Sequence, residues 1–90
     1  MVKTSQRVLQ YDLPLNITRD RSGGYTARCT VWPDCYAQGE TVDEAVLEVT
    51  AVAQSLIELY TEENLPIPLR RGKDRAIFKQ PFTVPVFVSA

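Results

Sequence analysis

The residues that decide the fold occupy positions 23–45, which read GGYTARCTVWPDCYAQGETVDEA. The two leading glycines permit the positive φ angles of a tight turn. Residues 25–31 then alternate like a half-buried strand, and Trp32-Pro33-Asp34 breaks that strand because proline has no N–H to donate. A short strand at 35–38 and a helix start at Thr41 follow. This stretch therefore predicts a turn, a strand, a break, a strand and a helix, in that order.

A first strand is predicted upstream of the turn, where apolar residues recur at every second position: Tyr11, Leu13, Leu15 and Ile17. The turn at 20–24 would pair this strand antiparallel with residues 25–31. Pro14 lies inside it and indicates an edge position or a bulge, because proline cannot donate to a sheet ladder.

Residues 41–64 predict one amphipathic helix. Thr41 can cap it and Glu44 stands at the reciprocal position of a capping box. Apolar residues follow the helical period on one face, and Asn64 before Leu65-Pro66 is a stop signal. The apolar face of this helix requires a sheet to cover it.

A loop at 66–75 and a final strand at 82–88 complete the chain, with Pro85 indicating an edge position or a bulge. The fold class is therefore α+β, in the order β-β-β-α-β, with a three- to four-stranded, mainly antiparallel sheet on one long helix. Residues 1–90 form a single domain, in which the polar residues 1–6 are expected to be a disordered tail.

The composition excludes several function classes. The chain has no histidine and two cysteines, which cannot supply the four ligands of a mononuclear zinc site or a Ser-His-Asp or Cys-His catalytic group. No cofactor and no enzymatic activity are expected. The absence of a signal peptide and of a long apolar run predicts a cytoplasmic protein with reduced thiols and no membrane segment.

Charge is segregated along the chain, although the formal net charge is only −1. Between positions 36 and 64 there are seven acidic residues and no basic one, whereas positions 70–79 hold five basic residues and one acid. Two interpretations are open: two solvated faces, or a polar surface for a partner or for another subunit.

Several residues in this order and spacing resemble the HicB-like antitoxin family of type II toxin–antitoxin systems, also known as the HicB or UPF0150-like domain. The matching residues are Gly23-Gly24-Tyr25, Pro33, Cys35, Gln38-Gly39-Glu40-Thr41, Glu44-Ala45, Leu59-Tyr60 and Ile67-Pro68. The resemblance covers about residues 11–69. The chain departs from the family pattern at Thr30, Val31 and Asp34, where the family places a proline, an acid and a glycine.

The resemblance implies a partial ribonuclease H-like fold and an antitoxin that binds and neutralises a small basic HicA-type mRNA-cleaving toxin by protein–protein contact. Many members add a C-terminal DNA-binding domain. Because the sequence ends at Ala90, DNA binding is not expected here.

The candidate residues fall into two sets. The candidate partner-binding residues are Trp32, Asp34, Glu44, Leu47, Glu48 and Glu58. Trp32 suits either a partner anchor or a cap on the small core, and an exposed Leu47 either touches a partner or has no role. A dimer or tetramer is expected, and the candidate oligomer strand comprises Phe82, Val84, Val86 and Val88.

Two other functions remain as alternatives. One is a stand-alone oligomeric HicB-like regulatory module without a toxin, and the other is a nucleic-acid binder that uses the basic loop at 70–79. Nuclease catalysis is not expected, since Asp12 and the Asp43/Glu44 pair fill two carboxylate places but residues 77–90 contain no acid.

Overall fold

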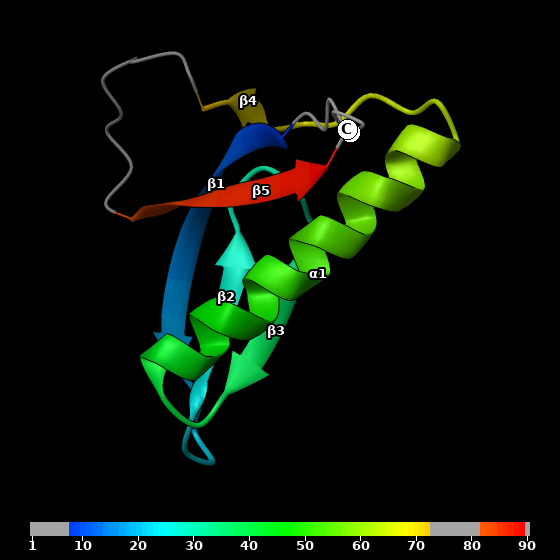
Figure 1. Ribbon diagram of the computed structural model, residues 1–90. Coiled ribbons are helices and arrows are strands. Elements are labelled where there is room, and N and C mark those ends of the chain that lie inside the picture. The colour runs from blue at the N-terminus through cyan, green and yellow to red at the C-terminus, as the bar shows by residue number, and fades with distance from the viewer. Residues whose placement is uncertain (1–7, 73–81, 90) are drawn as a thin grey trace, which may run out of the picture.

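The computed structural model describes residues 8–72 and 82–89 (Figure 1). Its elements, in chain order, are β1 (Val8–Arg19), β2 (Tyr25–Cys29), β3 (Tyr36–Gly39), α1 (Val42–Glu62), β4 (Arg70–Arg71) and β5 (Thr83–Ser89). The α+β class and the main β-β-β-α-β order are confirmed. The predicted tail at 1–6 and positions 73–79 of the basic loop lie outside the described residues.

All the strand pairs are antiparallel, and β1 is the central strand. Leu15 N–H donates to Phe82 O, which places β5 on one edge of β1. Thr30 N–H donates to Pro14 O and Gly72 N–H to Gln10 O, which places β2 and β4 on the other edge. β3 continues the sheet beyond β2.

The expectation that Pro14 marks an edge strand or a bulge is wrong, because β1 has neighbours on both edges. On the edge that Pro14 faces, β4 pairs with Tyr11 and Asp12, and the register with β2 begins only at Leu15. The missing N–H of Pro14 therefore falls between two short strands, where no ladder bond needs it. Residues 70–71, predicted as loop, form β4.

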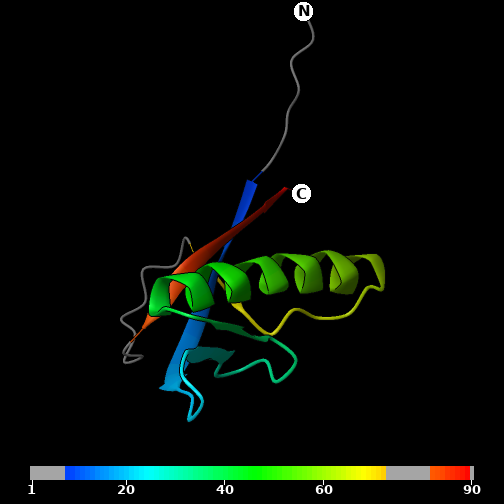
Figure 2. The ribbon, with the colours of Figure 1, turned by 90° about the horizontal axis from the view of Figure 1, so that it is seen from below.

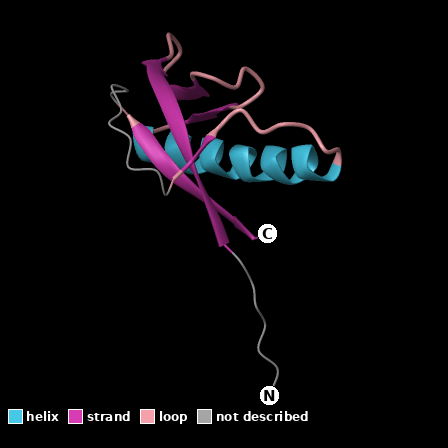
Figure 3. Cartoon of the chain, turned by 90° about the horizontal axis from the view of Figure 1, so that it is seen from above, coloured by secondary structure: helices cyan, strands magenta, loops and turns pink. Residues whose placement is uncertain are grey.

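The helix α1 lies across one face of the sheet (Figures 2 and 3). Its buried residues are Ala45, Val49, Ala53 and Ile57, as the helical period predicts. They pack on alternate residues of the strands, which include Leu13, Leu15, Ala27 and Val86. Within the described residues, no helix has the length and apolar character that crossing a membrane requires.

Both predicted ends of α1 are confirmed. Thr41 Oγ1 accepts a hydrogen bond of 3.1 Å from Glu44 N–H. The Glu44 carboxylate accepts one of 2.5 Å from Glu40 N–H, one residue before the cap. At the other end Asn64 adopts φ 57°, and Leu65 N–H donates to Tyr60 O. The left-handed residue stops the helix within two positions of Glu62.

Candidate partner-binding surface

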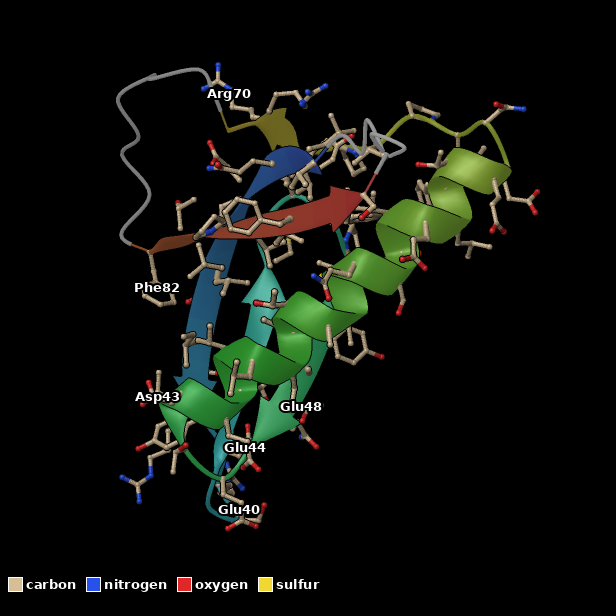
Figure 4. All side chains as sticks on the ribbon, in the orientation of Figure 1. Glu40, Asp43, Glu44, Glu48, Arg70 and Phe82 are labelled. Carbon is tan, nitrogen blue, oxygen red and sulfur yellow. The ribbon has the colours of Figure 1, made fainter. Side chains whose placement is uncertain are left out.

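Four carboxylates surround a hollow near the first turns of α1. The hollow has a volume of about 470 Å³ and is lined by the side chains of Asp20, Glu40, Glu44 and Glu48, with the glycine turn and Gln38-Gly39 between them. Figure 4 shows Glu40, Glu44 and Glu48 gathered at this end of the helix. We call this feature the acidic hollow.

Close backbone packing brings these acids together. A Cβ added at Gly24 would lie 2.9 Å from Gly39 O, and one added at Gly39 would overlap the backbone of Glu44 and Ala45. The turn, the end of β3 and the start of α1 therefore meet without intervening side chains. Asp20 is held in this corner by hydrogen bonds from Thr26 Oγ1 at 2.9 Å and Gln38 Nε2 at 3.4 Å.

The lining of the acidic hollow contains no lysine or arginine. Clustered carboxylates in a concave site concentrate the negative potential and attract cations. No group of three or more His, Cys, Asp or Glu residues in 8–72 and 82–89 is arranged to hold a metal ion. The acidic hollow is therefore a concave patch of negative potential.

Of the predicted partner residues, the structure brings Glu44 and Glu48 together at the acidic hollow. Leu47, between them in sequence, is 71% exposed on the outer side of α1. Glu58 is exposed further along the helix, and Asp34 is exposed in the β2–β3 loop. Neither lines the acidic hollow. One oxygen of Glu44 is already engaged by Glu40 N–H, so Glu44 also has a structural role.

Sequence reasoning missed Asp20 and Glu40 as members of this site. The sequence indicates Asp20 as a turn residue, and Glu40 as part of the acidic segment and of the family pattern. The hairpin between β1 and β2 brings Asp20 beside Gln38 in β3, although the two are eighteen positions apart. The available signal was the repeated glycine at 23, 24 and 39, which marks close approach of backbone segments.

Trp32 is a core residue and not an exposed anchor. It is 2% exposed, and its ring meets that of Tyr60 edge to face, with 4.9 Å between centroids and 78° between planes. Of the two interpretations of Trp32, the structure therefore supports the core cap. Its buried Nε1 has no hydrogen-bond partner among the described residues.

In the candidate oligomer strand β5, most of the predicted contact residues do not face solvent. Val86 and Val88 are buried under α1. Phe82 O accepts a hydrogen bond from Leu15 N–H. In an antiparallel pair this means that the backbone N–H and C=O groups of residues 82, 84, 86 and 88 also point towards β1. The exposed side of β5 carries Pro85 and Phe87 instead, so an intersubunit contact through this strand would use those residues.

The two cysteines are buried thiols. Burial raises the pKa of Cys35 to about 12, and the neighbouring Cys29 adds to the shift. Burial also raises the pKa of Cys29, against hydrogen bonds from the backbone of Val31 and Trp32. Neither thiol has the lowered pKa that nucleophilic or redox chemistry uses.

Arg70 and Arg71 of β4 lie away from the acidic hollow, whereas Arg19 and Arg21 flank Asp20 in the sequence. Figure 4 shows Arg70 at the end of the molecule opposite Glu40. Arg71 lies over the Tyr11 ring, 5.7 Å from its centroid, and Arg28 lies 4.9 Å from the centroid of Tyr36. Arg70 and the carboxylates of the acidic hollow are therefore far apart in space.

Comparison with known proteins gives two relatives of similar length. The chain is 31% identical to UPF0150 protein ssr1765 of Synechocystis sp. over 68 residues, which are 76% of this chain and 84% of that protein. It is 33% identical to UPF0150 protein Ta0767 of Thermoplasma acidophilum over 52 residues, 58% of this chain and 75% of that protein. No family model matches the chain.

Proposed function

The chain belongs to the UPF0150 family, and from this membership and its acidic surface we propose that it is a HicB-like antitoxin. The UPF0150 domain is the HicB-like domain that the sequence resembles. The proposed partner is a small, basic, mRNA-cleaving toxin of the HicA type. The proposed action is neutralisation by protein–protein contact, with no chemistry performed by this chain.

The acidic hollow is the observation that supports this proposal best. Four carboxylates converge there, and its lining holds no base. Such a patch accelerates encounter with a cationic partner and disfavours acidic ones. Because the patch is open to solvent, the attraction would weaken as salt shortens the Debye length below about 8 Å.

The exposed side of α1 adds an apolar contact to this electrostatic one. Leu47 is 71% exposed and lies next to Glu48 in sequence. An apolar side chain beside charged residues is typical of an interface in which a small buried centre is surrounded by a polar rim. The proposed interface therefore begins at the acidic hollow and continues over the outer side of α1.

Co-expression tests the proposal. The chain is produced with the product of the short reading frame adjacent to its gene, provided that this product is basic. Expected results are rescue of growth from the toxic product and co-elution of the two proteins. Replacing Glu40→Lys and Glu48→Lys should weaken the complex at least about tenfold. Glu63→Lys with Asp43→Lys, outside the hollow and outside the candidate partner-binding set, serves as the charge-matched control.

Failure of growth rescue together with separate elution of the two proteins would overturn the antitoxin proposal. Equal loss of affinity in both double variants would contradict the assignment of the acidic hollow, because net charge alone would then explain the attraction.

A stand-alone oligomeric module is the second candidate function, favoured by the sheet face that α1 leaves uncovered. Val8 is 63% and Phe87 50% exposed. In the β1–β5 register they fall on the side opposite the buried Val86 and Val88. Exposed apolar residues on one face suit contact between copies. Light scattering of the purified chain would give a multiple of 10.1 kDa if this holds and a monomer mass if it does not.

A further inference from the structure

A second concave feature lies at the other end of α1, between its last turns and the paired strands β1 and β5. It has a volume of about 340 Å³. Its apolar lining consists of Leu9, Tyr11, Ile57 and Val88, and its polar lining of Glu58, Thr61, Glu62 and Ser89. The last turns of α1 extend past the strands at this end (Figures 1 and 3). We call this feature the apolar groove.

The carboxylates beside the apolar groove repel each other in the isolated chain, and the described cation near the groove is Arg71, which lies over the ring of Tyr11. Glu58 and Glu62 stand four residues apart, a spacing at which like charges repel along a helix. They lie near the negative end of the helix dipole, and the last turn contains no basic residue. In the part of the chain that the structure describes, no ion pair or hydrogen bond is recorded for either carboxylate.

We propose that the apolar groove binds a segment of a partner protein that carries an apolar side chain flanked by lysine or arginine residues. The apolar side chain would contact Ile57 and Val88, and the flanking cations would meet Glu58 and Glu62. A cation there is favoured by both carboxylates and by the negative end of the helix dipole. The inference rests on the proposed function, a basic protein partner, and adds where an apolar part of it binds.

The apolar groove and the acidic hollow are separate contact regions. Glu48, in the hollow, and Glu58, beside the groove, are ten residues apart on α1. At about 1.5 Å per residue this is about 15 Å along the helix axis. A partner that uses both regions therefore has to follow α1 for about three turns.

Synthetic peptides probe the groove without knowledge of the partner. A lysine–leucine peptide is compared with its lysine–serine and glutamate–leucine counterparts, with binding followed by amide chemical shifts of the ¹⁵N-labelled chain. The lysine–leucine peptide should shift the signals of Leu9, Ile57 and Val88 and bind more tightly than the other two. Glu58→Gln with Glu62→Gln should weaken its binding about three- to tenfold at low salt.

Two variants separate the groove from general electrostatic attraction. Asp43→Asn with Glu63→Gln removes the same charge outside both the groove and the acidic hollow and should change the affinity by less than about twofold. Thr61→Phe should fill the groove and abolish the shifts, while the dispersion of the other signals reports that the fold is retained.

The inference is overturned by equal weakening in both charge-removing double variants or by equal binding of the serine peptide. It is also overturned by a marked gain in affinity after deletion of residues 1–6, which would identify the chain's own N-terminal residues as the occupant. If the toxin complex forms but none of the peptides shifts the signals of the groove residues, this inference alone is overturned. Peptide binding at the groove without any toxin complex would overturn the proposed function alone.

Discussion

At the scale of single residues, Gly39 is required by close packing. An added Cβ would lie 2.8 Å from Glu44 C and overlap the backbone of Ala45, where no flexible side chain can move aside. We therefore expect Gly39→Ala to lower the free energy of unfolding by about 1–3 kcal/mol. Urea titration measures this. Gly23→Asn is the control, since a Cβ at Gly23 meets no atom within 4 Å and asparagine tolerates positive φ. Equal losses would contradict the packing argument.

Cys35 gives the chain a pH dependence on the alkaline side. Its pKa rises from an ordinary value of 9.0 to about 12, chiefly because the thiol is buried. Above the unfolded pKa the folded state therefore binds more protons than the unfolded state, so stability is fully present below about pH 9 and falls towards about pH 12. The steepest loss is about 1.4 kcal/mol per pH unit.

Unfolding experiments at several alkaline pH values measure this loss. Cys35→Ala should be less stable near neutral pH but should show a flatter decline above about pH 9. Parallel declines in the two proteins would assign the alkaline loss to other groups.

At the scale of elements, the charges at the end of α1 oppose helix stability. Glu58→Gln with Glu62→Gln removes an i,i+4 repulsion and two acids from the negative end of the dipole. We expect the melting temperature to rise by about 1–3 °C, which thermal denaturation followed by circular dichroism measures. Asp43→Asn with Glu44→Gln, which removes two acids from the first turn, should lower it. A lower melting temperature in both double variants would contradict the dipole argument.

The helix and the main strands could be predicted because their signals are local. The period of Ala45, Val49, Ala53 and Ile57 reflects one apolar face, and Asn64 ends the helix through its own backbone angle. β4 could not be predicted, since two residues have no periodicity and pair only because β1 has a free edge there. Pro14 was assigned to an edge because the gap between β4 and β2 depends on where those strands begin and end.

At the scale of the whole molecule, the candidate site was predictable only in part. Glu44, Leu47 and Glu48 follow from the helical pattern, because one exposed side of a helix collects residues with that spacing. Asp20 joins them through the β1–β2 hairpin. Trp32 was ambiguous because an aromatic residue in a loop suits a core or an interface, and only its contact with Tyr60 decides between them.

The outer edge of β5 is protected against pairing with another strand. Backbone groups of residues 83, 85, 87 and 89 face this edge, but Pro85 has no N–H, and Phe87 O accepts a 2.9 Å hydrogen bond from Gln54 Nε2.

Pro85→Val with Gln54→Ala should restore a backbone donor and a backbone acceptor at the outer edge of β5. We expect concentration-dependent assembly beyond the parent protein's mass, measured by size-exclusion chromatography with light scattering. Pro33→Val in the β2–β3 loop with Ser55→Ala at an exposed position of α1 is the matched control. An unchanged mass in the first variant would mean that the side chain of Phe87 or the helix itself, and not the missing backbone groups, keeps this edge closed.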